Sequence, residues 1–392
     1  MPHCSLEEGV AIGNKVMIIA GELSGDLHGA HLARELWNLK SDLTIYGVGG
    51  PRMGSLGIDL LYDSTFWGAI GLTGAFRKAP FLLKALNKIT KGIKDSPPDA
   101  IVLIDFGAFN LRLAKKIKEL DIPIIYYFPP GAWCPNPERA MGVAKYVSKV
   151  AATFPESARV FQEIGAEVEF VGHPLIDIVK PKRLPEEVFK NLKLDPSLPV
   201  VGLFPGSRVQ EVKLLLPTMM KVALEIQRRE GPVQYVLPVA SRAVKPYINR
   251  ILKKYPQVAV GLTHGSSYDI MQICKVLVLG AGTATLEAAC LGIPMVVLGK
   301  VSYIDYLFLL CKEGKRKPEF FALPNMVAGQ RIVPEFIQGD IQVNKVVNEV
   351  ITLLKDSSAR EEVRKGLSDV VSKIGSPGVV GRVASIVMEF LT

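Results

Sequence analysis

The fold class of this chain is decided by Lys15-Val16-Met17-Ile18-Ile19-Ala20-Gly21-Glu22-Leu23-Ser24-Gly25-Asp26. Residues 15–20 form an almost continuous apolar run, which is typical of a strand buried on both faces of a parallel sheet. A glycine turn follows, and a helical pattern begins at Asp26. A strand, a tight turn and a helix in this order predict the repeating element of α/β proteins.

The same alternation continues along the chain. Further buried strands are expected at 100–104, 122–128, 168–171, 200–204, 235–238, 276–279 and 294–298, with helical stretches between them that include 111–120 and 285–291. Apolar runs that alternate with helices predict parallel sheets, so the fold class is α/β.

A change of composition near residue 180 divides this pattern. Proline and charge interrupt it at Lys180-Pro181-Lys182-Arg183-Leu184-Pro185, and a polar helix and a new apolar strand at Val200 follow. We therefore expect two α/β domains, residues 1–180 and 181–392. Loops that follow the strand ends of two such halves face a ligand in a cleft, and proteins of this kind are usually enzymes.

The charge balance favours an acidic partner. The 392 residues include 47 Lys and Arg against 38 Asp and Glu, a net charge of +9. Nucleic acid, anionic lipid and phosphorylated metabolites all carry negative charge. The mean hydropathy of +0.25 favours a membrane surface over a duplex, and no motif of a nucleic-acid-binding protein accompanies the charge.

Cysteine spacing and the N-terminal residues bear on compartment. The five cysteines form neither a CxxC pair nor a cluster with histidine at metal spacing, so we expect no zinc site and no disulfide framework. The first eight residues are polar and acidic, unlike a signal peptide, and no apolar stretch reaches about 18 residues. These features predict a cytoplasmic protein that lies against a membrane rather than crossing it.

Three loops of the first half carry candidate chemistry. Gly21 to Asp26 opens a helix whose N-terminus can hold an oxyanion, although Asp26 can also serve as a helix cap. The loop lacks the GxGxxG spacing of a dinucleotide site, so no NAD cofactor is expected. Asp105 follows a buried strand and suits a general base, because Asn110 is the better helix cap. His173, between Gly172 and Pro174, either titrates or only holds its loop.

Two loops of the second half suit phosphate. Pro205-Gly206-Ser207-Arg208 ends a strand and precedes a helix, so close backbone approach, a hydroxyl and a guanidinium fork together predict a diphosphate clamp. Gly280-Ala281-Gly282-Thr283-Ala284-Thr285-Leu286-Glu287 repeats this arrangement, and Glu287 can accept hydrogen bonds from ribose hydroxyls. Two such loops in one domain favour a nucleoside diphosphate.

Two segments mix aromatic and basic residues. The first is Phe66 to Phe76 with Arg77, Lys78, Lys84 and Lys88 beyond it, and the second is Tyr303 to Phe321. Each is either a loop packed on the core or an apolar flap that meets acyl chains and anionic head groups.

Six motifs in this order and spacing resemble the lipid-A-disaccharide synthase family. They are residues 20–30, Gly49-Gly50-Pro51-Arg52-Met53, Val171-Gly172-His173-Pro174-Leu175, Pro205-Gly206-Ser207-Arg208, residues 282–288 and Leu323-Pro324-Asn325. The resemblance runs from about Lys15 to Gln338. It implies a GT-B glycosyltransferase with two Rossmann-like domains, the second for a UDP-sugar and the first for a lipid acceptor. It also implies a final helix that crosses back to the first domain, for which residues 379–390 are sufficiently apolar.

The implied reaction joins UDP-2,3-diacylglucosamine to 2,3-diacylglucosamine 1-phosphate, with inversion and without a metal or other cofactor. The resemblance, read with the loops above, assigns catalytic roles to Asp105, Arg208 and Glu22, donor binding to Gly206, Ser207, Arg208, Gly282, Thr283, Glu287 and Asn325, and acceptor binding to Ser24, Asp26, Asn110 and His173. The other expected partner is the anionic inner face of the cytoplasmic membrane, which the protein contacts peripherally. Nucleic acid is not expected as a partner. The oligomeric state is left open.

The chain departs from the family pattern mainly in the acceptor half. Ala108 replaces a second acid, Pro129 to Pro135 keeps only one tryptophan, and Gly299-Lys300 replaces Tyr-Arg. The alternatives are a GT-B enzyme acting on another glycolipid, a UDP-sugar epimerase, and a non-catalytic nucleotide-sugar or lipid binder.

Overall fold

The computed structural model describes residues 14–65, 67, 72–130, 137–265, 267–300 and 319–391. The chain divides into two compact units. The first contains Met1–Gly68, Lys78–Val171 and Val380–Thr392, and the second contains Ala69–Arg77 and Gly172–Val379. Residues 172–180, which the sequence placed in the first domain, thus belong to the second unit, and the last residues of the chain belong to the first.

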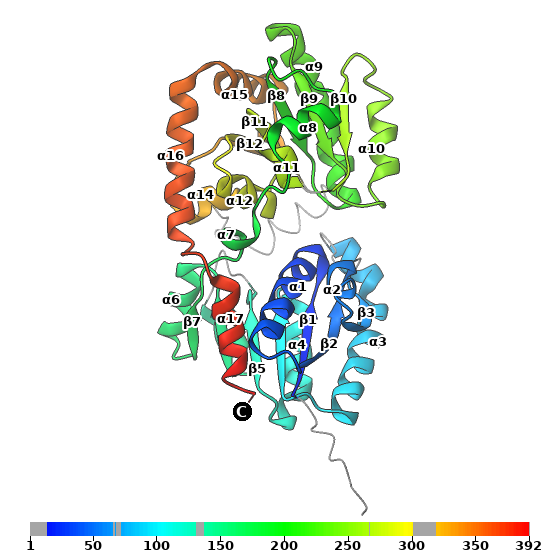
Figure 1. The fold of residues 1–392 in the computed structure, drawn as a ribbon, viewed down its shortest axis with the longest axis vertical. Helices are drawn as coiled ribbons and strands as arrows, with labels where there is room; N and C mark the ends of the chain where they lie inside the picture. Colours follow the sequence, from blue (N-terminus) through cyan, green and yellow to red (C-terminus); the bar gives the residue numbers. More distant parts are fainter. Residues whose placement is uncertain are drawn as a thin grey trace, which may run out of the picture. The chain divides into compact units, whose positions relative to one another are not determined.

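The first unit is built on a seven-stranded parallel sheet with the order β3-β2-β1-β4-β5-β6-β7. Its elements, several of which are labelled in Figure 1, are β1 (Lys15–Ala20), α1 (Glu22–Leu39), β2 (Thr44–Gly49), α2 (Pro51–Gly54), β3 (Asp59–Asp63), α3 (Leu72–Asp95), β4 (Ala100–Ile104), α4 (Gly107–Ile117), η1 (Lys118–Leu120), β5 (Ile124–Tyr127), α5 (Pro137–Ala144), β6 (Lys149–Ala152), α6 (Pro155–Glu163), β7 (Val168–Phe170) and the final helix α17 (Val379–Met388).

The second unit has a six-stranded parallel sheet with the order β10-β9-β8-β11-β12-β13. Its elements are α7 (Leu175–Ile178), α8 (Pro185–Leu192), β8 (Val200–Phe204), α9 (Val209–Glu230), β9 (Gln234–Pro238), α10 (Lys245–Leu252), β10 (Val260–Thr263), α11 (Ser267–Met271), β11 (Val276–Gly280), α12 (Thr283–Cys290), β12 (Met295–Gly299), α14 (Leu323–Ala328), β13 (Glu335–Ile337), η2 (Gln338–Asp340), α15 (Val343–Lys355) and α16 (Ser357–Lys373).

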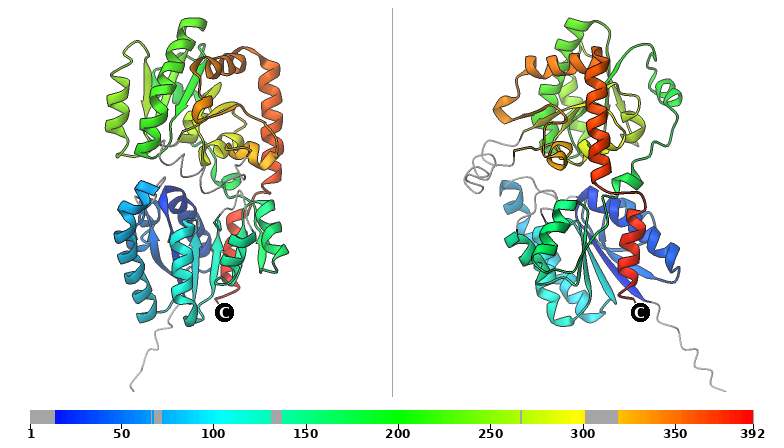
Figure 2. Two further views of the ribbon diagram at one scale, coloured as in Figure 1. Left: turned by 180° about the vertical axis from the view of Figure 1, so that it is seen from behind. Right: turned by 90° about the vertical axis from the view of Figure 1, so that its left-hand side faces the viewer.

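Both sheets are covered by helices on their two faces, as their apolar strands require. In the first unit, α3 and α4 pack on one face, whereas α1 and α17 lie on the other (Figures 1 and 2). In the second unit, α9, α10 and α15 bury one face of the sheet. The expected central strands are confirmed, but β2, β3, β6, β10 and β13 were not expected, because these strands are short or carry polar residues.

The final helix packs on the first unit, as expected. Arg382 of α17 donates from Nε to the carbonyl of Val171 at 3.0 Å. The ammonium of Lys149, on β6, lies 2.9 Å from the Glu389 carboxylate and 3.2 Å from that of Glu169. Burial opposes the charge of Lys149, but the hydrogen bonds and charges of the two carboxylates outweigh it and raise the Lys149 pKa. The last turn of the chain is thereby held to the sheet.

Candidate active site

Each sheet has one point where the strand order reverses, and the expected site residues follow the strands there. In the first sheet, β1 and β4 are neighbours, with Ala20 paired to Ile104 at their carboxyl ends. Asp105 comes directly after β4, and Glu22 is the second residue after β1. In open parallel sheets, ligands bind outside the strand ends at this reversal. The topology thus brings Glu22 and Asp105 to one edge of the first unit.

The backbone at this edge is strained. Glu22, Asp105, Phe106 and Phe128 all have positive φ, between 48° and 61°, although none is glycine. Each of these four residues follows the end of β1, β4 or β5. A left-handed non-glycine residue costs about 1–3 kcal/mol, and such residues cluster at functional sites. The first unit therefore concentrates backbone strain around the predicted base.

Asp105 is held by its own backbone. Its N–H donates to the carbonyl of Tyr127 at 3.2 Å. Its carbonyl accepts hydrogen bonds from Asn110 Nδ2 at 2.8 Å and from Tyr126 Oη at 3.0 Å. The Asp105 side chain is half-buried, whereas Asn110 and Tyr126 are completely buried. Asn110 does not cap α4, as the sequence suggested, because that helix begins earlier, at Gly107.

Asp26 has a structural role that the sequence did not predict. The residue is 1% exposed and lies inside α1. Its carboxylate accepts hydrogen bonds from the backbone N–H groups of Gly50 at 2.7 Å, Arg52 at 2.9 Å and Met53 at 3.0 Å. Asp26 thus caps α2 rather than its own helix. All three of these bonds are internal to the first unit, and contact of this side chain with the acceptor stays a prediction. Ser24, two residues earlier, is half-buried in the first turn of α1.

His173 lies in the second unit and is 3% exposed. Its backbone N–H donates to the carbonyl of Ile374, and its ring Nδ1 accepts from the N–H of Leu175 at 3.3 Å. Burial lowers the His173 pKa to about 3, so the ring is neutral at physiological pH. A neutral, buried ring does not supply the charge that the sequence interpretation considered for binding a phosphate.

The reversal point of the second sheet carries the predicted phosphate loops. Phe204 of β8 pairs with Leu279 of β11, so the loops that follow both strands are neighbours. Gly206 has a φ of +111°, and a Cβ there would lie 2.1 Å from Oε2 of Glu211. Only glycine therefore fits between this loop and the first turn of α9. Thr283 begins α12 and is exposed, and Glu287, one turn later, is half-buried.

Glu211 organises the first of these loops, and sequence reasoning missed this role. Its carboxylate accepts a hydrogen bond from the backbone N–H of Arg208 at 3.1 Å and lies 2.9 Å from the Arg208 guanidinium. The Arg208 side chain is 40% exposed while its guanidinium is paired with Glu211. The sequence signal that could have revealed this role is a capping box, in which an acid stands three residues after the N-cap. It was hard to see because the N-cap residue is arginine rather than serine or threonine.

Asn325 has a structural role as well, and its expected contact with the donor stays a prediction. It is completely buried. Its Nδ2 donates to the carbonyl of Val333 at 2.9 Å, and its Oδ1 accepts from the N–H groups of Ile332 and Val333. Glu335 accepts the N–H groups of residues 321 and 322 at the start of α14. This polar network joins α14 to β13, and it leaves the amide turned inward.

Comparison with known proteins adds the family. A model of the lipid-A-disaccharide synthetase family matches residues 16–383. This chain belongs to that family. The lipid-A-disaccharide synthase of Geobacter sulfurreducens is 36% identical over 380 residues, which is 96% of this chain and 97% of the relative. That of Geobacter metallireducens is also 36% identical, over 98% of this chain and 99% of the relative.

Solved structures show the fold that this synthase family member shares. UDP-GlcNAc 2-epimerase from Neisseria meningitidis, solved with UDP-GlcNAc, has a TM-score of 0.64 at 14% identity, covering 96% of this chain and 99% of that one. MurG of Acinetobacter baumannii has a TM-score of 0.58 at 13% identity with the same coverage. These similarities support the GT-B architecture of two Rossmann-like domains. Family membership makes the chain a glycosyltransferase and disfavours an epimerase.

Several expectations for this synthase fall outside the described residues. They are the altered tryptophan loop at 131–136, residues 303–318 of the second aromatic and basic segment, and residues 66 and 68–71 of the first. Among the described residues, no helix combines the length and apolarity needed to cross a membrane. In the same part of the chain, His, Cys, Asp and Glu side chains nowhere gather in a group of three or more suited to a metal.

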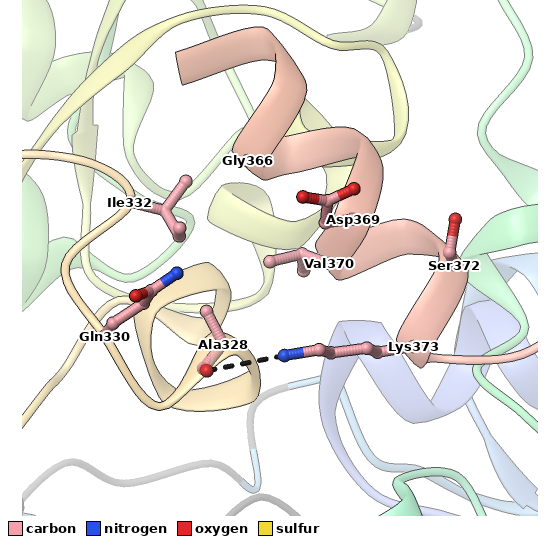
Figure 3. Close-up of a pocket in the computed structure, with 8 residues that line it drawn as sticks. All are labelled: Ala328, Gln330, Ile332, Gly366, Asp369, Val370, Ser372 and Lys373. Carbon is pink, nitrogen blue, oxygen red and sulfur yellow. Dashed lines mark hydrogen bonds between the residues drawn. The ribbon is translucent and has the colours of Figure 1, made fainter. Parts of the chain in front are cut away.

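A separate cavity of about 360 Å³ lies in the second unit between α14 and α16. Figure 3 shows Gln330 and Ile332 on one side and Asp369 and Val370 of α16 on the other. Lys373 Nζ donates to the carbonyl of Ala328 at 3.4 Å across its lower edge. None of the predicted site residues lines this cavity.

Proposed function

We propose that this family member transfers a 2,3-diacylglucosamine unit from its UDP ester to 2,3-diacylglucosamine 1-phosphate, giving the disaccharide 1-phosphate and UDP. The observation that carries the proposal is the family match over 16–383, which includes the strand ends of both sheets. The sugar-nucleotide donor is further supported by a GT-B neighbour solved with UDP-GlcNAc.

Asp105 is the general base of the proposed reaction. Its carboxylate takes the proton of the acceptor 6-hydroxyl, and the hydroxyl oxygen then forms a bond to the anomeric carbon. The bond from that carbon to the UDP oxygen breaks, so the configuration inverts and UDP leaves with the electron pair. The half-buried position of Asp105 at the reversal point, on a strained and firmly held backbone, supports this role. Glu22, at the start of α1, assists Asp105 in catalysis, and Ser24 contacts the acceptor.

The second unit stabilises the departing UDP. Backbone N–H groups in the loop at Gly206 and Ser207, the start of α12 at Gly282 and Thr283, and the guanidinium of Arg208 supply positive potential without a metal. Glu211 holds that guanidinium in place at 2.9 Å. Glu287 accepts hydrogen bonds from the ribose. Buried Asn325 and His173 act through the backbone segments that they hold.

The membrane partner is supported by the described part of α3. Phe81, Lys84, Lys88 and Lys91 follow one another at helical spacing and are all exposed. Phe81 and the neighbouring Leu83 are each 51% exposed. Apolar and basic side chains on one helix suit an anionic bilayer surface. We place the enzyme at the cytoplasmic face of the inner membrane.

Vesicle binding tests this surface. The double variant Lys84→Glu with Lys91→Glu should lower affinity for vesicles with anionic lipid by about tenfold or more, because each nearby basic residue contributes about 1 kcal/mol. Lys253→Glu with Lys254→Glu, two exposed lysines of the second unit, is the matched control. Equal binding of the vesicles by both double variants would show that α3 does not form the membrane-binding surface.

The reaction itself is tested with purified full-length protein, UDP-2,3-diacylglucosamine and 2,3-diacylglucosamine 1-phosphate. We expect disaccharide and UDP in equal amounts, with UDP release dependent on the acceptor. UDP-sugar conversion without acceptor would instead indicate an epimerase. Turnover only with a different glycolipid would show that the acceptor is that glycolipid. Tight UDP binding with no turnover on any glycolipid would indicate a binding protein.

A further inference from the structure

The predicted base, Asp105, and the residue after it both have a left-handed backbone conformation. Asp105 has a φ of +51° and Phe106 a φ of +48°. Left-handed non-glycine residues persist only where the surroundings hold them. Some of this support is steric: a Cβ at Gly21 would lie 2.4 Å from Cβ of Phe106, so Phe106 packs directly on the turn after β1. The ring of Phe106 also contacts those of Trp67 and Phe109.

The polar part of this support converges on one atom. The Asp105 carbonyl oxygen accepts hydrogen bonds from Asn110 and Tyr126, at 2.8 and 3.0 Å, which uses both of its lone pairs. Asn110 belongs to α4, which follows Asp105, whereas Tyr126 belongs to the next strand of the sheet, β5. Tyr126 is thus the one of the two donors that ties the Asp105 carbonyl to a neighbouring strand.

The hydroxyl of Tyr126 is a dependable donor. Tyr126 is completely buried on a strand whose pairing with β4 runs from Ile101 to Ile104. Burial and, after it, the negative charge of Asp105 raise the pKa of Tyr126 well above its usual value, although a side-chain hydrogen bond with Asn110 acts in the opposite direction. The phenol therefore keeps its proton throughout the range in which an aspartate base works.

We propose that Tyr126 is a positioning residue for the reaction: its hydroxyl fixes the Asp105 carbonyl, and thereby the direction in which the Asp105 carboxylate meets the acceptor hydroxyl. This inference rests on the proposed role of Asp105 as base. Tyr126, being buried behind the loop, acts through Asp105 and touches no substrate.

Tyr126→Phe removes one oxygen atom and keeps the packing of the ring. We expect kcat to fall by about tenfold to a hundredfold, because small displacements of a reacting group have effects of this size, with KM for both substrates within about twofold. UDP affinity should not change. The matched control is Tyr235→Phe on β9, where a buried hydroxyl donates to the carbonyl of Ala223 at 2.8 Å. That variant loses a comparable bond and should keep kcat.

A double-mutant cycle separates positioning from a general structural role. In an Asp105→Asn background, Tyr126→Phe should leave the residual rate unchanged, because no base remains to be positioned. The inference would be overturned if the loss of kcat in the double variant equalled the product of the losses in the two single variants. Equal losses of kcat in Tyr126→Phe and Tyr235→Phe would also overturn it. Asn110→Leu removes the other hydrogen-bond donor to the Asp105 carbonyl and should also lower kcat. This variant provides the test if Tyr126→Phe does not fold. High turnover by Asp105→Asn alone would instead refute the proposed base.

Discussion

The two sheets have the same strand order around their reversal points, but different residue types adopt a positive φ there. In the first, non-glycine residues with positive φ follow β1, β4 and β5, and Asp105 is one of them. In the second, the corresponding place after β8 is occupied by Gly206 at a φ of +111°. At the first point the left-handed residue Asp105 carries a carboxylate, whereas at the second point Gly206 lets the backbone approach Glu211 closely. One topology thus carries the base that we propose in one unit and the anion site that we propose in the other.

The strongest test of this contrast is Asp105→Asn. We expect turnover to fall by about 10²–10⁴-fold, the usual contribution of a general base. UDP affinity, measured by calorimetry, should not change, because the loops that we propose for UDP belong to the second unit. The control is Asp121→Asn, since Asp121 is also left-handed in the first unit, at a φ of +49°, but is exposed after η1. Equal losses in both variants would contradict a special role for Asp105.

The internal hydrogen bonds of Asp26 predict the next largest effect. Asp26→Asn should lower the free energy of unfolding by about 2–3 kcal/mol, because a buried carboxylate that accepts three backbone N–H groups loses part of that set. Turnover per folded molecule should remain. Asp356→Asn, at the exposed N-cap of α16, should cost about 1 kcal/mol or less in the same denaturation experiment. An intact fold with lost acceptor affinity would restore Asp26 as a binding residue.

Gly206→Ala tests the second unit. A Cβ would lie 2.1 Å from the Glu211 carboxylate, so the loop must shift and its N–H groups must turn. We expect UDP affinity to fall by about tenfold, in line with about 1–3 kcal/mol for such strain. Gly231→Ala is the control, because Gly231 has a φ of +81° and open space around it. That variant should lose stability and keep its affinity for UDP.

The smallest effect concerns His173. Burial lowers its pKa to about 3, so between that value and the unfolded pKa near 6.5 the unfolded chain binds the additional proton. Stability therefore decreases as pH falls through this window. Between pH 7 and pH 6 the contribution is about 0.7 kcal/mol. His173→Asn should lose less stability than the wild type over this step in chemical denaturation, whereas His264→Asn, which removes an exposed imidazole, should behave like the wild type.

Sequence reasoning performed best where the signal was local. The apolar runs of β1, β4, β8 and β11 predicted the central strands and hence the loops that follow them. It did not predict the internal hydrogen bonds of Asp26 and Asn325, both buried polar residues inside motifs of the family. A carboxylate or amide that binds a ligand and one that binds a distant backbone segment look the same in a sequence, since the difference is the partner.

The sequence by itself determined the α/β class, the two Rossmann-like halves, the family and the position of Asp105 after a central strand, because all of these follow from apolar periodicity and colinear motifs. Only the tertiary structure decided which polar residues turn inward. Asp26 caps α2 from within α1, Glu211 closes on Gly206, and Tyr126 reaches the Asp105 carbonyl from the neighbouring strand. These bonds join segments whose proximity depends on packing of the sheet and its helices, and burial then decides whether a side chain meets backbone or ligand.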